Sequence, residues 1–229
     1  SDITVLHAHI FQHFQIATIH APMAAAFNGD GFQNKYIGSL KNAISGISSN
    51  YTCATHAFNK TGNAEGELIG GNLAIIAHLI GSHSSYKTRH KILFLEDVGE
   101  YFYAVDRLLW ALKRSGKLAE IAGLIIGGFT GLEDNEPPFG ESVADMVMAL
   151  TAEYSYPLAF DFPAGHLADN RALILGGKVQ LSVDEKKVNY FTRKDILWSD
   201  FGDPRISKYE KFSEEEMVVH FNKCVAPYR

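Results

Sequence analysis

The stretch KILFLEDVGEYFYAVDRLLWALKRSGKLAEIAGLIIGGF, residues 91–129, decides the fold class. It opens with KILFL, an apolar run of the length of a buried strand, and it closes with a second such run, AGLIIGGF. Between the two runs, apolar side chains recur at helical spacing until Gly116, a residue type that commonly ends a helix. These side chains are Val105, Leu108, Leu109 and Leu112. A strand, a helix and a strand in this order predict a βαβ unit with parallel strands.

The alternation continues on both sides of this unit. GGNLAIIAHLIG before it predicts a helix, and ESVADMVMALTAEYS and PLAFDF after it predict a helix and a strand. The pattern then changes to ALIL, GGKVQLSV and DEKKVNYF, which predict antiparallel strands with tight turns at Gly176, Gly177 and Asp184. The sequence therefore predicts a mixed α/β domain over residues 65–191.

The N-terminal part of the sequence predicts a smaller unit. ITVLHAHIFQHF carries apolar side chains at helical spacing, namely Ile3, Leu6, Ile10 and Phe14. IATIHAP then predicts a short strand, residues 36–46 a weak helix, and the polar stretch SSNYTCATHAFNKTGNAEGE a domain boundary. We expect residues 1–64 to be the end of one α/β domain with its linker, and residues 192–229 to be a C-terminal extension, either a helix or a tail.

The amino-acid composition limits the kinds of molecule that the protein is expected to bind. The 229 residues are 46% hydrophobic and 21% charged, which is enough to bury a substantial core. A net charge of −5 without a Lys/Arg block predicts neither a nucleic-acid nor a membrane partner, and no apolar run approaches the roughly 20 residues of a membrane span. Cys53 and Cys224 are too few for a disulfide scaffold. No initiator Met or leader precedes Ser1, so we expect the natural start to lie upstream.

Residues able to do acid–base chemistry follow two of the predicted strands. Glu96 and Asp97 follow KILFL, and His166 follows PLAFDF. The carboxyl ends of parallel strands converge, so a carboxylate and an imidazole there can meet and the carboxylate can orient the histidine as a general base. The residues alone leave open a solvated strand end for Glu96 and an ordinary hydrogen-bonded loop position for His166.

Ser1, at the head of the first predicted helix, offers a nucleophile for such a pair. A serine at a sharp turn before a helix exposes its hydroxyl, and the N–H of Asp2 can stabilise an oxyanion. The ordinary alternative is a helix N-cap followed by an acidic first turn.

Six segments in order resemble motifs of the LD-carboxypeptidase family, which includes the microcin-immunity peptidases. These segments are SDIT with LH (residues 1–4 and 6–7), HAPM (20–23), GELIGGNLA (66–74), ILFLED (92–97), VDRLL (105–109) and GH (165–166). Ala21 and Ala164 stand where the family usually has Gly and Phe. The family's first domain, with the strand that sets up the nucleophile turn, precedes the first of these segments.

The resemblance implies a serine peptidase triad of Ser1, Glu96 and His166 that works through an acyl-enzyme. It makes the amide of Asp2 one oxyanion donor and places a second donor in the segment upstream of this chain. The implied substrate is a murein tetrapeptide, cut at the L,D-peptide bond before its terminal D-alanine, and neither a metal nor another cofactor is implied.

The resemblance also implies the remnant of an N-terminal parallel α/β domain, joined to a C-terminal mixed α/β domain of the swivelling β/β/α kind. Gly70, Gly71 and Asn72 are expected to bind substrate, although a tight turn that caps a helix would explain them equally well. A homodimer and a cytoplasmic location are expected.

Three other hypotheses remain open. An N-terminal-nucleophile hydrolase also begins on a serine, but it requires a layered αββα pattern. A metal-binding protein is conceivable because His9 and His13 share one helix face, and Cys53 and His56 have ligand-like spacing. The third hypothesis is a non-catalytic peptide-binding descendant, or fragment, of the peptidase family.

Overall fold

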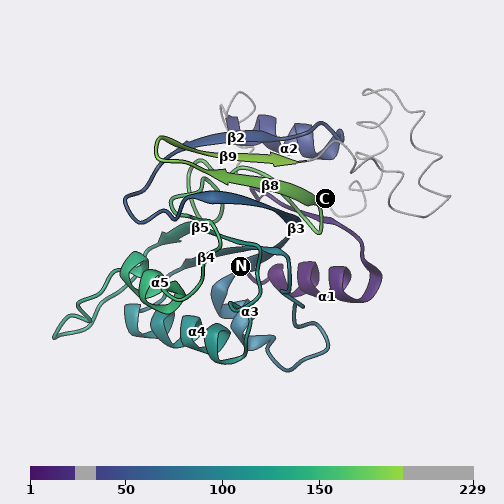
Figure 1. The fold of residues 1–229 in the computed structure, drawn as a ribbon. Coiled ribbons are helices and arrows are strands. Elements are labelled where there is room, and N and C mark those ends of the chain that lie inside the picture. The colour runs from purple at the N-terminus through teal and green to yellow at the C-terminus, as the bar shows by residue number, and fades with distance from the viewer. Residues whose placement is uncertain (24–34, 193–229) are drawn as a thin grey trace. The chain divides into compact units, whose positions relative to one another are not determined.

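A seven-stranded mixed sheet forms the centre of the computed structural model, which describes residues 1–23 and 35–192 (Figure 1). In spatial order its strands are β2 (Asn50–Ala54), β9 (Lys187–Thr192), β8 (Lys178–Val183), β3 (Gly62–Asn72), β4 (Ile92–Val98), β5 (Gly123–Thr130) and β6 (Leu158–Ala159). The strands from β3 to β6 run parallel, whereas β2, β9 and β8 pair antiparallel with their neighbours. The predicted mixed α/β fold is confirmed.

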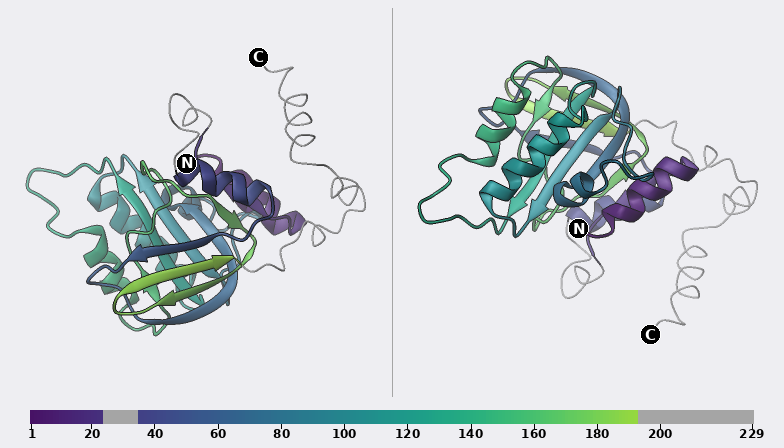
Figure 2. Two further views of the ribbon diagram at one scale, coloured as in Figure 1. Left: turned by 90° about the horizontal axis from the view of Figure 1, so that it is seen from above. Right: turned by 90° about the horizontal axis from the view of Figure 1, so that it is seen from below.

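Helices flank this sheet. They are α1 (Thr4–Phe14), α2 (Lys35–Ile44), α3 (Leu73–His78), α4 (Phe102–Arg114) and α5 (Val143–Thr151). In the view from below, α3, α4 and α5 lie across one face of the parallel strands (Figure 2). A separate two-stranded sheet pairs β1 (Thr18–His20) with β7 (Leu173–Leu175) in antiparallel register.

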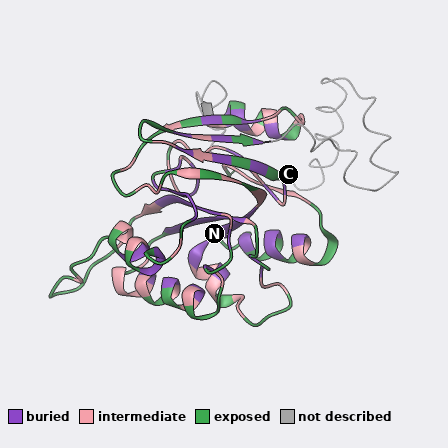
Figure 3. Ribbon diagram, viewed as in Figure 1, coloured by how far each residue is buried: buried purple, intermediate pink, exposed green. Residues whose placement is uncertain are grey.

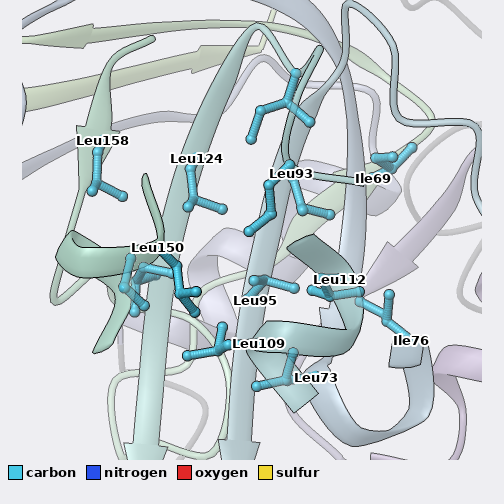
Figure 4. Packing of buried hydrophobic residues seen from close by; sticks show 14 of the residues in the cluster. Ile69, Leu73, Ile76, Leu93, Leu95, Leu109, Leu112, Leu124, Leu150 and Leu158 are labelled. Carbon is cyan, nitrogen blue, oxygen red and sulfur yellow. The ribbon is translucent and has the colours of Figure 1, made fainter. Parts of the chain in front are cut away.

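The parallel strands are buried on both faces, which explains why they read as unbroken apolar runs. In β4, Leu93 and Leu95 pack with the helices, in the cluster to which α4 contributes Leu109 and Leu112 (Figure 4). The alternate residues Ile92 and Phe94 belong to a second cluster on the opposite face. Buried residues accordingly run through the centre of the sheet and along the inner sides of the helices (Figure 3).

Strand β3 joins the two halves of the sheet. Residues 62–67 pair antiparallel with β8, and residues 68–72 pair parallel with β4. The last of the parallel pairs sets Asn72 directly opposite Glu96. The end of β3 therefore lies beside the predicted carboxylate.

Most predicted elements are confirmed, with differences of detail. GGNLAIIAHLIG is split between the end of β3 and the short helix α3, and PLAFDF holds only the two-residue strand β6. ALIL becomes β7, whose partner is β1 and not the hairpin of β8 and β9. The predicted extension lies outside the described residues.

Helix α1 does not bury the apolar residues that revealed it. Ile3, Leu6 and Phe14 are 52%, 53% and 63% exposed, while the buried side consists of Thr4, His7, Ala8 and Phe11. Two of these buried residues are polar and have specific partners, because Thr4 Oγ1 accepts a hydrogen bond from the N–H of Asn72 and His7 Nδ1 bonds to Thr18 Oγ1. Hydrogen bonding, and not hydrophobicity alone, sets this orientation.

The polar stretch expected at a domain boundary contains β2 and the first half of β3. Both segments are hydrogen-bonded into the seven-stranded sheet. Division of the chain at residue 64 stays a prediction. Among the described residues, no helix has the length and apolar character required to cross a membrane.

Candidate active site

Glu96 and His166 meet at the carboxyl ends of the parallel strands. Glu96 lies near the end of β4 and is 1% exposed, and His166 lies in the loop that follows β6. The ring atom Nδ1 of His166 is 2.6 Å from Oε2 of Glu96. With Nδ1–H donating to the carboxylate, Nε2 is the nitrogen left to exchange a proton with a ligand.

Two features of its surroundings shift the pKa of Glu96 in opposite directions. Burial raises the pKa of the Glu96 carboxyl, while the hydrogen bond and the charge of His166 lower that pKa. The second oxygen, Oε1, is buried without a hydrogen-bond partner in the described part of the chain. The imidazole of His166 is therefore the main polar partner of the Glu96 carboxyl group.

Gly165 lets the histidine loop approach Glu96. Its φ of +103° lies in the region that side-chain-bearing residues rarely adopt, and a Cβ atom there would stand 2.7 Å from the Cβ of Glu96. The N–H of Gly165 donates to Oδ1 of Asn170 at 2.9 Å, and Thr130 Oγ1 donates to the carbonyl of His166 at 2.9 Å. The first bond closes the loop on itself and the second ties it to the end of β5, so together they set the position of the ring.

Ser1 lies near this pair. Its carbonyl accepts the N–H of Thr4 at 2.9 Å, and Thr4 Oγ1 accepts the N–H of Asn72, the residue opposite Glu96 in the parallel register. Ser1 and Asp2 are exposed, and Ile3, not Ser1, occupies the N-cap position of α1. Within residues 1–23 and 35–192, no hydrogen bond joins Ser1 Oγ to the ring of His166.

Gly70, Gly71 and Asn72 lie at the buried end of β3. A Cβ atom on Gly70 would stand 1.9 Å from the carbonyl oxygen of Phe94, and one on Gly71 would stand 2.6 Å from Oγ1 of Thr4. Both glycines therefore permit close packing between β3, β4 and α1. Asn72 is 2% exposed and caps α3, since its Oδ1 accepts the N–H of Ile75. Substrate binding by these three residues stays a prediction.

His20 is a site neighbour to which the sequence analysis assigned no role beyond a motif match. Part of the residue is exposed, but its Nε2 atom is fully shielded and has no hydrogen-bond partner among the described residues. Its ring meets that of Phe94 edge-on, with 5.4 Å between centroids. Burial lowers the pKa of His20 to about 4, with smaller contributions from the charges of His7 and His166. No local pattern predicts such an environment, because it forms only when β1 docks.

The residues considered as metal ligands do not gather. His9 and His13 contact each other, with 4.3 Å between ring centroids, and Nδ1 of His9 bonds to Ser84 Oγ. His56 Nδ1 accepts the N–H of Phe58. The described part of the chain holds no group of three or more His, Cys, Asp or Glu residues able to bind a metal ion.

Comparisons with known proteins agree with the motif resemblance. The model of the LD-carboxypeptidase C-terminal domain matches residues 65–181. The chain is 31% identical over 189 residues to a probable murein peptide carboxypeptidase of Bacillus subtilis, covering 81% of this chain and 59% of that protein. It is also 31% identical over 185 residues to a murein tetrapeptide carboxypeptidase of Pseudomonas aeruginosa, covering 75% of this chain and 58% of that protein.

A solved structure shares the fold. The crystal structure of a muramoyltetrapeptide carboxypeptidase from Oxalobacter formigenes matches with a TM-score of 0.74 and 26% identity, covering 84% of this chain and 66% of that one. The chain therefore spans about three fifths of the length of the two sequence relatives and two thirds of that of the solved structure.

Proposed function

Because the chain belongs to the LD-carboxypeptidase family, we propose that it is a serine peptidase that releases the terminal D-alanine of murein tetrapeptides. The observation that carries this proposal is the 2.6 Å contact between Nδ1 of His166 and Oε2 of the buried Glu96. The relatives from Bacillus subtilis and Pseudomonas aeruginosa are named as a probable murein peptide carboxypeptidase and a murein tetrapeptide carboxypeptidase, and these names suggest the substrate class. The bond cut is the L,D-peptide bond between a diamino acid and D-alanine.

In the proposed reaction, Ser1 is the nucleophile. Nε2 of His166 accepts the hydroxyl proton while Ser1 Oγ attacks the carbonyl carbon of the scissile bond. The N–H of Asp2 donates to the oxyanion that develops. The protonated ring then gives its proton to the departing amino group of D-alanine, which leaves an acyl-enzyme. A water molecule, deprotonated by the same ring, hydrolyses this ester and restores the serine.

Glu96 acts on this cycle through the imidazole. Its contact with Nδ1 fixes the ring orientation and leaves Nε2 facing the reaction. The positive charge that forms on the ring lies beside a carboxylate that is 1% exposed, where water screens the attraction little. The pair therefore stabilises the charged ring at the step in which the serine loses its proton. No metal or cofactor is needed for these steps.

The groups around the triad have to position the serine and the substrate. Ser1 Oγ must reach hydrogen-bonding distance of Nε2 once substrate is bound, a tightening that free enzymes commonly require. The backbone of Gly70, Gly71 and Asn72 lines the substrate, since the side chain of Asn72 is already bonded within the protein. A homodimer in the cytoplasm completes the proposal.

A peptide-binding descendant is the second candidate function. It is favoured by the missing hydrogen bond between Ser1 Oγ and the ring of His166 in the described residues. Such a protein would bind the peptide without turning it over.

One experiment separates the two candidates. The purified protein and its Ser1→Ala variant are incubated with a murein tetrapeptide, and D-alanine release is followed by mass spectrometry. The peptidase proposal requires release by the parent and loss of at least about a thousand-fold in the variant. If neither protein releases D-alanine but both bind the peptide equally in calorimetry, the binding function is correct and the peptidase proposal is wrong.

A further inference from the structure

A buried hydrogen-bond network connects the first turn of α1 with the strand that carries Glu96. The backbone N–H of Asn72 donates to Oγ1 of Thr4 at 3.1 Å. The side chain of Asn72 donates from Nδ2 to Oδ1 of Asp97 at 2.6 Å, and its Oδ1 accepts the N–H of Ile75 at 3.1 Å. Asn72 and Asp97 are each 2% exposed, so little water competes for these bonds.

The two carboxyl oxygens of Asp97 accept hydrogen bonds from three secondary-structure elements. Oδ1 accepts from Nδ2 of Asn72 and from the N–H of Val98, and Oδ2 accepts from the N–H of Ala74 at 3.0 Å. The donors belong to the end of β3, the first turn of α3 and the end of β4. A single side chain thus fixes the ends of two parallel strands and the start of the helix between them.

The network acts where the proposed catalytic groups converge. Asn72 stands directly opposite Glu96 in the parallel register, and Asp97 follows Glu96 in the chain. Thr4 is three residues after Ser1, and its N–H bonds to the carbonyl of Ser1 at 2.9 Å. A shift of Asn72 would therefore move the serine segment and the carboxylate relative to each other.

We propose that Asn72 and Asp97 are positioning residues that hold the Ser1 segment in register with the Glu96–His166 pair. This inference rests on the proposed peptidase function, and it assigns the side chain of Asn72 to the protein frame instead of to the substrate. Neither residue touches the reacting atoms. Both act through Glu96 and through Thr4, so their removal lowers kcat more than it changes KM.

An exchange of the two residues provides the test. Asp97→Asn alone has one side-chain oxygen in place of two, so it can accept from Nδ2 of Asn72 or from the N–H of Ala74 but not from both. Asn72→Asp alone sets two carboxyl groups together. The exchanged protein, Asn72→Asp with Asp97→Asn, restores the side-chain hydrogen bond and the cap on the N–H of Ile75. It loses only the second bond to Oδ1 of Asp97, that from Val98. Asn63→Asp, an exposed change in the same strand, is the matched control.

We expect each single variant to lose about 10- to 100-fold in kcat with KM changed less than about threefold, and the exchanged protein to recover at least about tenfold. Asn63→Asp should match the parent. If the single variants lose thermal stability while kcat keeps its parental value, the network is only structural and the inference is wrong. If the exchanged protein does no better than the single variants, the hydrogen bond between the two side chains has no positioning role and the inference is equally wrong.

A second readout separates this inference from the proposed function. The ring-proton NMR signals of His166, assigned with a His166→Gln variant, should change in chemical shift in the single variants and return to the parental values in the exchanged protein. That result from a protein that releases no D-alanine would support positioning of the pair and refute the peptidase proposal. Unchanged chemical shifts of the His166 ring in the single variants of an inactive protein would refute both.

A milder pair of variants covers the case in which the Asp97 variant does not fold. Thr4→Ser keeps the hydroxyl that accepts the N–H of Asn72, whereas Thr4→Val removes it at nearly constant volume. The inference requires Thr4→Val to lose about tenfold in kcat and Thr4→Ser to stay within about twofold of the parent. Equal activity of the two proteins would overturn it.

Discussion

Replacement of Gly165 by alanine adds a single methyl group, but it should lower both the stability of the protein and its activity. Residue 165 has a φ of +103°, which costs an alanine about 1–2 kcal/mol. The new Cβ would stand 2.7 Å from the Cβ of Glu96, whereas ordinary contacts begin at 3.4 Å, so one of the two residues must move by about 0.7 Å. Such overpacking adds about 1–3 kcal/mol, so we expect a total loss of about 2–5 kcal/mol in the free energy of unfolding.

The same movement should break the contact between Glu96 and His166. Lengthening a 2.6 Å hydrogen bond by about 0.7 Å takes it beyond the usual range, and a misplacement of this order can lower turnover by about a hundred-fold. Unfolding in urea and D-alanine release measure the two effects.

Gly140→Ala supplies the control. Its φ is +86°, but no atom lies within 4 Å of the added Cβ, so only the backbone cost of about 1–2 kcal/mol applies. Equal losses of stability and turnover in the two variants would show that the approach of Gly165 to Glu96 has no energetic consequence, and this reasoning would fail.

Two further predictions concern the acid–base groups. Glu96→Gln keeps the shape of the residue but offers no charge to the ring of His166. The rate of D-alanine release should therefore fall about 10³- to 10⁴-fold, while the midpoint of thermal unfolding changes little. A loss below tenfold would show that Glu96 has no role in the mechanism. His20 has a pKa of about 4 in the folded protein against 6.5 for a free side chain, so the unfolded chain binds the extra proton between these values. The free energy of unfolding of the parent should therefore fall by up to about 3 kcal/mol as the pH falls from 6.5 to 4, and that of His20→Gln should fall correspondingly less. Both proteins retain the smaller effect of His7, because burial also lowers the pKa of that side chain. Urea unfolding from pH 4 to pH 7 compares the two, and parallel stability curves would contradict the assignment.

Three strands of the parallel core, β4, β5 and β6, could be predicted from the sequence because each carries its own signal. Strand β3 was not predicted, because its residues fall in the stretch expected to be a domain boundary and in the run expected to be a helix. The apolar runs of β4 and β5 and the helical spacing in α4 are local patterns, and they survive unchanged in the structure. The meeting of Glu96 with His166 followed from one general rule about strand ends, supported by the family motifs.

The missed features depend on distant partners. β2 buries only Tyr51, so its polar alternation looks like a loop until β9 lies beside it. The orientation of α1 depends on the partners of Thr4 and His7, and the shielding of Nε2 in His20 depends on the position of β1. No window of neighbouring residues contains this information.

The dual pairing of β3 has a consequence for the order of folding during synthesis. Its parallel partner follows within about thirty residues, whereas residues 62–67 must wait for residues 178–183 to emerge from the ribosome. During that interval the nascent chain presents an open strand edge, the kind of surface that recruits other chains. This waiting segment carries Glu65 and Glu67 on either side of Gly66, and such charges discourage aggregation at an edge. Neutral replacements of both glutamates should lower the yield of newly made protein more than they lower the stability of protein that has already folded.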